Sequence, residues 1–207
     1  MSSNNFSIPV LLGLDTSGPR LQLALRAGQI THQFVQDIAK GHAEILFDCL
    51  AQFLADNGLT YSKITKIITT TGPGSFTGLR IGIAAARGLG LARQVPVLGI
   101  PNLLALSLEE TKTNFAIVVD ARRGQFYAQH FKSAGVALSD PELIDQKIFD
   151  TDYALTCASI ITDPKVNMGT LMKFCENLDA KEYPPTPTYV READAKPQTK
   201  LRIARHE

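Results

Sequence analysis

The nine residues Gly72-Pro73-Gly74-Ser75-Phe76-Thr77-Gly78-Leu79-Arg80 decide how this chain is organised. Residues 64–71, just before them, read as a buried strand because they are rich in β-branched Ile and Thr and contain neither Gly nor Pro. The glycines and Pro73 break that strand. Ser75 or Thr77 can then cap a helix with its hydroxyl. The segment is therefore predicted to be a strand, a tight turn and a helix.

A glycine-rich turn before a helix can also bind a phosphate group. This turn lacks the Gly-Lys-Ser/Thr ending of a P-loop, and its third glycine comes one residue later than in Gly-x-Gly-x-x-Gly. Pro73 also removes one backbone N–H donor from the turn. We predict a structural turn here and keep phosphate binding as the alternative.

The helix after this turn is expected to pack on two sides. Its small residues recur every fourth position and form one ridge, at Gly78, Gly82, Ala86 and Gly90. Its charged residues are three arginines, and Arg80 and Arg87 lie within about 20° of each other around the helix axis. The rest of its circumference is apolar or bare, which favours contact with its own sheet and with a second helix.

A second helix, predicted over residues 41–57 with Gly58 as its C-terminal cap, has the same excess of apolar residues. Its polar residues form one stripe, at Glu44, Asp48, Gln52 and Asp56. A helix that lies on a sheet needs only one apolar face. Two helices that are apolar on a second side indicate a protein interface, or else a sandwich within the chain.

Composition describes an ordinary globular protein of 207 residues, with 44% hydrophobic and 20% charged residues. The net charge of +1 creates no field that would recruit nucleic acid by itself. Three widely spaced cysteines without a Cys-x-x-Cys pair argue against a disulfide framework or a zinc site. The apolar run at residues 8–14 is too short for a membrane segment or signal peptide. We expect a cytoplasmic protein that does not contact a membrane.

The order of predicted elements indicates an α/β protein with two domains. The first hundred residues read β-β-β-α-β-α-β-α, which is typical of a mixed sheet with helices on both faces. After a polar break at residues 111–114, a strand, an Asp-containing turn and a strand follow, as at the start of the chain. We therefore predict domains at residues 1–111 and 112–207. In the second we expect strands near 142–148 and 154–161, a helix near 170–178 and a basic tail from Lys196.

Two polar motifs are candidate sites. Asp15-Thr16-Ser17, in the first predicted hairpin, could hydrogen-bond a ligand phosphate, or it could be an Asp/Ser turn that satisfies its own backbone. His42 would need a second metal ligand one helical turn later, and that position is Leu46. We predict no metal site.

Several of these stretches resemble the TsaB family of the bacterial threonylcarbamoyl-adenosine tRNA-modification machinery. Residues 72–80 match the family signature, and His42-Ala43-Glu44-x-Leu46 is similar to its His-Ser-Glu-x-Leu helix start. Asp120-Ala121-Arg122 and Pro187-x-Tyr189-Val190-Arg191 resemble its second hairpin and C-terminal motif. The resemblance covers essentially the whole chain and is weakest at residues 150–185.

The resemblance implies an actin/Hsp70-like fold of two ribonuclease-H-like domains, the second one reduced. It implies a scaffold that binds the catalytic paralogue TsaD and acts with the ATPase TsaE, with tRNA reached indirectly through the complex. It also implies a homodimer when the partner is absent. The family's partner surface is formed by the two helices described above, where we expect the contacts to be made by Ala43, Leu46, Phe47, Leu50, Leu54, Phe76, Leu79, Gly82, Ile83, Ala86 and Gly90.

Under this hypothesis the chain is not an enzyme and needs no cofactor or metal. TsaD carries a His-x-x-x-His metal pair, whose second position here is Leu46, and the second hairpin lacks the glycines of active superfamily members. Asp15, Thr16 and Ser17 are then candidates for a vestigial nucleotide site. The alternatives are a nucleotide-binding enzyme of the sugar-kinase type and, ranked last, a metallopeptidase.

Overall fold

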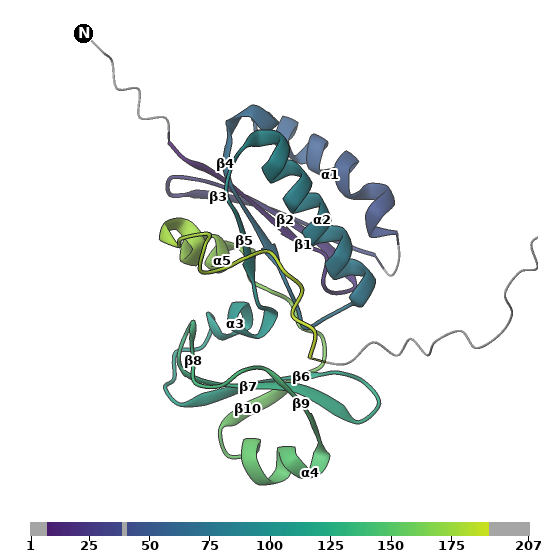
Figure 1. Ribbon diagram of the computed structural model, residues 1–207, viewed down its shortest axis with the longest axis vertical. Coiled ribbons are helices and arrows are strands. Elements are labelled where there is room, and N and C mark those ends of the chain that lie inside the picture. Colours follow the sequence, from purple (N-terminus) through teal and green to yellow (C-terminus); the bar gives the residue numbers. More distant parts are fainter. Residues whose placement is uncertain (1–7, 39–40, 191–207) are drawn as a thin grey trace, which may run out of the picture.

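The computed structural model describes residues 8–38 and 41–190 and contains two β-sheets with helices between and around them (Figure 1). The basic tail predicted from Lys196 lies outside these residues. Among the described residues, no helix has the length and apolar character that crossing a membrane requires.

The first sheet has the strand order β3-β2-β1-β4-β5. Its first three strands form the predicted antiparallel meander, namely β1 (Val10–Asp15), β2 (Arg20–Ala27) and β3 (Ile30–Asp37). β4 (Ile64–Thr70) and β5 (Val97–Ile100) extend the sheet in parallel with β1, and the one-turn η1 (Tyr61–Lys63) leads into β4. The parallel pairs need helical crossovers, and the two long helices supply them.

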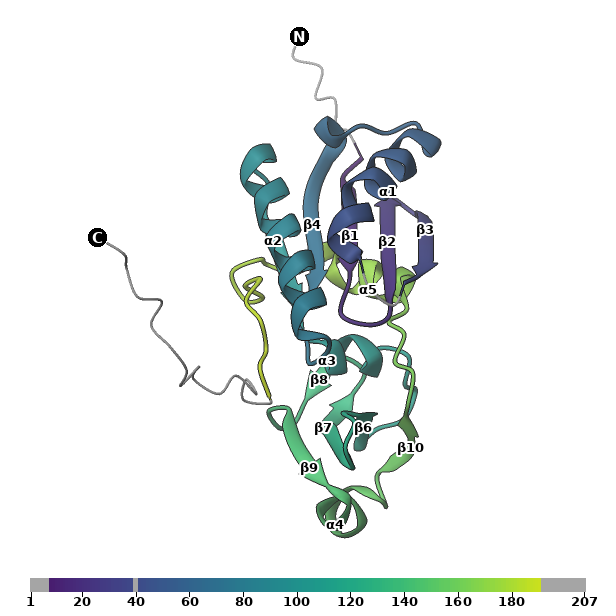
Figure 2. The ribbon, with the colours of Figure 1, turned by 90° about the vertical axis from the view of Figure 1, so that its right-hand side faces the viewer.

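The helices α1 (His42–Asp56) and α2 (Phe76–Arg93) lie side by side on one face of the first sheet (Figure 2). Leu46 and Leu50 of α1 pack with Leu12 and Leu23 of the sheet in one buried cluster. Asn57 ends α1 and Gly58 follows with a φ of 64°, in agreement with the predicted glycine cap. This face therefore holds one of the hydrophobic cores.

The second sheet has the order β10-β6-β7-β8, and β9 pairs with β7. Its strands are β6 (Phe115–Asp120), β7 (Gln125–Ser133), β8 (Val136–Ala137), β9 (Glu142–Asp145) and β10 (Cys157–Ile161). The strand predicted over 142–148 was wrong in its second half. Asp145 accepts a hydrogen bond from the backbone N–H of Ile148 at 3.0 Å, and so caps the short α4 (Gln146–Ile148), which runs into η2 (Phe149–Tyr153).

A second core lies between the two sheets. The helices α3 (Asn102–Ser107) and α5 (Met168–Phe174) with η3 (Cys175–Asn177) contribute to it, together with Leu11 of the first sheet and Phe131 of the second. The layers thus run from α1 and α2 through both sheets to α4 (Figure 1). α5 packs on β1, β2 and β3, although it follows the second sheet in the chain. The predicted division at residue 111 stays a prediction, and it assigns α5 to the second domain although this helix packs on the first sheet.

Candidate functional site

The turn between β4 and α2 lies directly on the turn after β1. The backbone N–H of Ser75 donates to the carbonyl of Ser17 at 2.7 Å, and a Cβ on Gly74 would meet that carbonyl oxygen at 2.7 Å. A Cβ on Gly78 would collide with the carbonyl oxygen of Thr16. Ser75 caps α2, as predicted, by accepting from the N–H of Gly78. The glycines of the signature are required because two backbones approach closely here.

The carboxylate of Asp15 is buried and fully engaged within the chain. Its Oδ1 accepts from the backbone N–H and the hydroxyl of Ser17, at 2.9 and 2.6 Å, and from the hydroxyl of Thr70 at 2.7 Å. Its Oδ2 accepts from Nε2 of Gln22 at 2.7 Å. The amide of Asn102 donates to the Ser17 hydroxyl at 2.6 Å. This arrangement corresponds to the structural alternative for Asp15-Thr16-Ser17, in which the turn satisfies its own polar groups.

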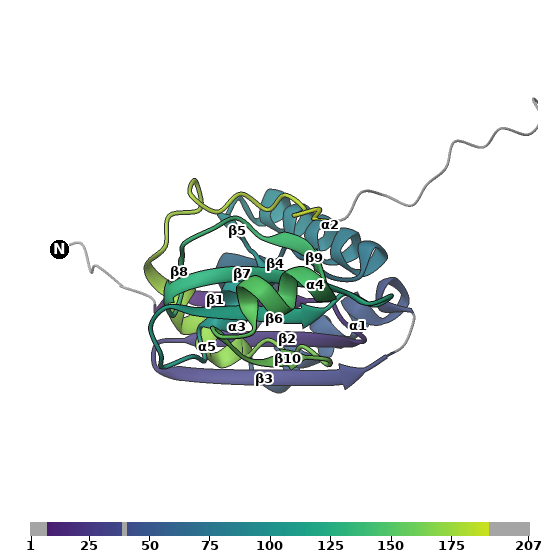
Figure 3. The ribbon, with the colours of Figure 1, turned by 90° about the horizontal axis from the view of Figure 1, so that it is seen from below.

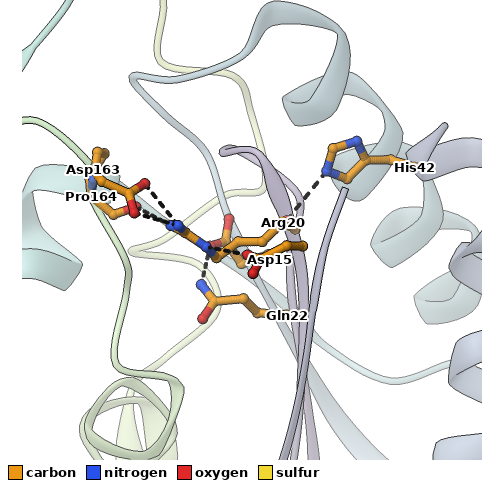
Figure 4. A network of polar contacts seen from close by, with 7 residues as sticks. Asp15, Arg20, Gln22, His42, Asp163 and Pro164 are labelled. Atoms are coloured by element: carbon orange, nitrogen blue, oxygen red, sulfur yellow. Dashed lines mark hydrogen bonds and ion pairs between the residues drawn. The ribbon is translucent and has the colours of Figure 1, made fainter. Parts of the chain in front are cut away.

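Arg20 connects the first sheet to the chain that follows the second sheet (Figure 4). Its Nη2 contacts both carboxylate oxygens of Asp163, at 2.8 and 2.6 Å, and its Nη1 donates to the carbonyl of Pro164 at 3.1 Å. This hydrogen-bonded pair lowers the pKa of Asp163 and raises that of Arg20. His42 adds a contact at the other end, where its Nε2 donates to the carbonyl of Arg20 at 3.3 Å.

A cavity of about 790 Å³ lies among these elements, lined by both Asp-containing turns, the start of α1 and residues 162–166. Among the described residues that line it, none has a buried side-chain nitrogen or oxygen without a hydrogen-bond partner. On the second turn, Arg122 and Arg123 have φ values of 68° and 59°, and the N–H of Arg122 donates to Asp120 at 2.8 Å. The cavity is large enough for a small ligand, but its buried polar groups already satisfy one another.

No cluster of three or more His, Cys, Asp or Glu side chains within the described residues could hold a metal ion. His42 is buried and bonded to Arg20, as described above, and Leu46 is 1% exposed in the core of α1. Of the two positions that a helical pair of metal ligands would occupy, one thus holds a hydrogen-bonded imidazole and the other a leucine of the core.

The structure places most of the residues predicted at the partner interface inside the chain. Eight of them are buried by the chain's own core, namely Leu46, Leu50, Leu54, Leu79, Gly82, Ile83, Ala86 and Gly90. The glycine ridge packs on the sheet beneath α2, because a Cβ on Gly82 would collide with the Thr16 hydroxyl and one on Gly90 with Val97. The ridge serves helix-to-sheet contact, and the chain itself covers these eight residues.

Three of the predicted residues, Ala43, Phe47 and Phe76, are exposed, and Phe47 keeps 50% of its surface accessible. Further exposed small or apolar residues on the same helices were missed, although Ala43, Phe47, Ala51 and Ala55 already follow the four-residue spacing of one helix face. The outer face of α1 and α2 consists of Ala43, Phe47, Ala51, Ala55, Ala84, Gly88 and Leu91. Leu91 is 82% exposed, and a Cβ on Gly88 would meet no atom within 4 Å.

Comparison with known proteins places the chain in a family. Residues 34–151 match the model of the family described as "TsaD: tRNA N6-adenosine threonylcarbamoyltransferase". The chain belongs to this family. An uncharacterised protein of Mycobacterium tuberculosis is 30% identical over 206 residues, which cover 92% of this chain and 95% of that protein.

Named relatives identify the chain as TsaB/YeaZ-like. The tRNA threonylcarbamoyladenosine biosynthesis protein TsaB of Bacillus subtilis is 27% identical over 146 residues, 69% of this chain and 63% of that protein. TsaB of Haemophilus influenzae is 33% identical over 124 residues, 56% and 51% of the two chains. YeaZ from Pseudomonas aeruginosa superposes with a TM-score of 0.70 at 22% identity, over 88% of this chain and all of that one. The likeness confirms the predicted actin-like α/β fold.

Proposed function

We propose that this chain is a non-catalytic scaffold in tRNA threonylcarbamoyladenosine biosynthesis. The observation that carries the proposal is the outer face of α1 and α2, whose exposed small and apolar residues belong to two long helices that lie side by side. Exposed apolar surface of this kind is typical of protein interfaces, and small residues let a partner helix approach closely. The TsaB names of the relatives supply the pathway.

The partner that we propose is a catalytic paralogue of the TsaD type, because the chain belongs to the family described by that name. A TsaE-like ATPase would act on the pair, and tRNA would be reached through the complex. Without the paralogue, the same surface would join two copies of the chain into a homodimer.

The chain's own polar groups support a non-catalytic role. The carboxylate of Asp15 receives four hydrogen bonds within the chain, so binding a nucleotide there would require breaking an existing network. A buried network that is fully satisfied is costly to open. At the two positions that a helical metal pair would use, the His42 imidazole is hydrogen-bonded to Arg20 and Leu46 is a core side chain without a ligating atom.

The proposal is tested by placing a charge on the outer face. Gly88→Arg and Ala84→Arg should weaken binding to the purified TsaD-type paralogue by about tenfold or more, because an unpaired charge would be buried in the contact. Leu155→Arg is the control, since Leu155 is 97% exposed and belongs to the second sheet's side of the molecule. Wild-type affinity of both helix variants in calorimetry would contradict the scaffold surface.

A sugar-kinase-like enzyme remains the second candidate because the cavity of about 790 Å³ adjoins the Ser17 turn. Titration of the wild-type chain with ATP and magnesium separates the two functions. Stoichiometric binding that is lost in a Ser17 variant, and unchanged in Gly88→Arg, would favour the enzyme.

A further inference from the structure

Phe76, Arg80 and Tyr189 form an exposed cluster at the start of α2. The rings of Phe76 and Tyr189 are 5.4 Å apart at their centroids, and the Arg80 guanidinium carbon lies 3.8 Å from the centre of the Phe76 ring. The Arg80 Nε donates to the Tyr189 hydroxyl at 3.2 Å. Phe76 and Tyr189 nevertheless keep 43% and 49% of their surface exposed. The three side chains, which we name the aromatic platform, thus hold one another in place while facing solvent.

The platform is held by the chain before Tyr189, which runs along the edge of the first sheet. The N–H of Gly99 donates to the carbonyl of Tyr183 at 2.9 Å, and the N–H of Thr188 donates to the carbonyl of Thr71 at 2.8 Å. A Cβ on Gly99 would meet Pro185 at 2.6 Å, so this segment lies close against β5. The platform is therefore organised before any ligand arrives, and little conformational entropy is lost on binding.

The helix that carries Phe76 and Arg80 has only positive charges. Among the described residues Nη1 and Nη2 of Arg80 have no hydrogen-bond partner. The whole of α2 contains no Asp or Glu, and its charged residues are Arg80, Arg87 and Arg93. After Val190 the sequence continues with five Lys or Arg and three Asp or Glu in residues 191–207. The charged residues of α2 are thus all basic, and the sequence after Val190 carries two more basic than acidic residues.

The platform lies on the opposite edge of α2 from α1, because the segment leading to Tyr189 and α1 lie on either side of α2 (Figures 2 and 3). The exposed surface of α1 also carries the acidic Glu44, Asp48 and Asp56, each one residue after a member of the outer face. A polyanion would therefore be attracted to the platform edge and repelled from α1. The outer face of α1 and α2 stays available for a protein.

We propose that the aromatic platform binds single-stranded RNA, by stacking one unpaired base on Tyr189 and Phe76 and by engaging a phosphate with the Nη groups of Arg80. Exposed aromatic rings beside an arginine plane accept any base, because every base has a π-face. A planar guanidinium with two free nitrogens matches a phosphate in a bidentate geometry. The chain would then contact RNA directly, which goes beyond the scaffold role.

The test uses the full chain alone and a fluorescent single-stranded RNA of about ten nucleotides, followed by anisotropy at several salt concentrations. Tyr189→Ala should weaken binding about tenfold, the loss expected for one stacked base. Arg80→Lys should weaken binding with the salt dependence unchanged, because the charge stays and the plane is lost. Arg80→Gln should also make the salt dependence shallower. Photo-cross-linking should attach RNA to Phe76 or Tyr189.

The controls separate this proposal from the scaffold. Lys63→Gln removes one exposed positive charge far from the platform and should leave affinity within about twofold. Gly88→Arg, which disrupts the proposed protein surface, should not lower RNA affinity. If Tyr189→Ala and Arg80→Lys bind RNA as the wild type does, the proposal is overturned. It is equally overturned if these variants weaken only the association with the TsaD-type paralogue, since the platform would then be a protein contact.

Discussion

Gly82 of α2 packs directly on the hydroxyl of Thr16, in the turn after β1. Gly88, six residues further along the same helix, faces open space. The same residue type therefore has opposite roles on the two sides of α2. On the inner side glycine permits close contact between the helix and the residues beneath it. On the outer side it leaves the helix backbone without a projecting side chain.

Gly82→Ala should destabilise the protein, because the added methyl group overlaps the Thr16 side chain and overpacking costs about 1–3 kcal/mol. Gly88→Ala should instead stabilise it by up to about 1 kcal/mol, since alanine favours the helix and meets no neighbour. Chemical denaturation of the two variants measures both free energies. Equal effects at the two positions would contradict the assigned packing of α2.

Asp15→Ala should lower the free energy of unfolding by several kcal/mol, because the variant leaves buried donors of Ser17, Gln22 and Thr70 without their acceptor. Each unsatisfied buried group costs about 1–3 kcal/mol. Thermal unfolding would report a lower midpoint. Asp56→Ala is a matched control, since Asp56 is an exposed carboxylate at the end of α1. A normal midpoint for Asp15→Ala would mean that the network does not support the fold.

The contact between Arg20 and Asp163 should make stability depend on pH. Because Arg20 lowers the pKa of Asp163 in the folded chain, the contact stabilises fully above the pKa of an unfolded aspartate, about 4. Its contribution is lost as the pH falls through the lower, folded pKa. Denaturation from neutral to acid pH should therefore show that the free energies of unfolding of the wild type and Asp163→Asn converge at the acid end. Asp140→Asn, an exposed position without this contact, should not converge in the same way.

Lys66 should protect the thiol of Cys175 from solvent. Its Nζ donates to the carbonyls of Cys175, Glu176 and Leu178, at 3.2, 2.9 and 3.1 Å, and so fastens the end of α5 and η3 to the first sheet. Burial raises the pKa of Cys175 to about 12, which leaves the thiol protonated and unreactive at neutral pH. Lys66→Met should therefore increase labelling of Cys175 by a thiol reagent, as read by mass spectrometry.

Lys63→Met serves as the control for this experiment, because Lys63 is an exposed lysine at the end of η1, directly before β4, the strand that carries Lys66. In this variant, Cys175 should be labelled by the thiol reagent to the same extent as in the wild type. If Lys66→Met also leaves Cys175 unlabelled, packing alone holds α5 in place.

The elements of the first sheet were predictable from the sequence because each has a local signal. Alternating apolar residues mark β2, and the turn at Gly72 separates β4 from α2 by the conformations that Gly and Pro allow. The end of β9 was not predictable in this way. The apolar residues around Asp145 indicate a strand when they are read alone, whereas Asp145 in fact caps a helical turn. The candidate vestigial nucleotide site at Asp15 was recognisable as a sequence motif. The hydrogen bonds that engage Asp15 within the chain were not predictable from that motif.

The sequence alone determined that α1 and α2 carry more apolar surface than one sheet contact needs, because helical periodicity assigns each residue to a face of the helix. Only the tertiary structure decided which of these residues the chain itself buries, since Gly82 and Ala86 turn inward while Phe47 and Gly88 remain outside. It also brought Tyr189 beside Phe76 and Arg80, more than a hundred residues apart in sequence. No local pattern encodes such a meeting, because it depends on how the C-terminal segment crosses the edge of the sheet.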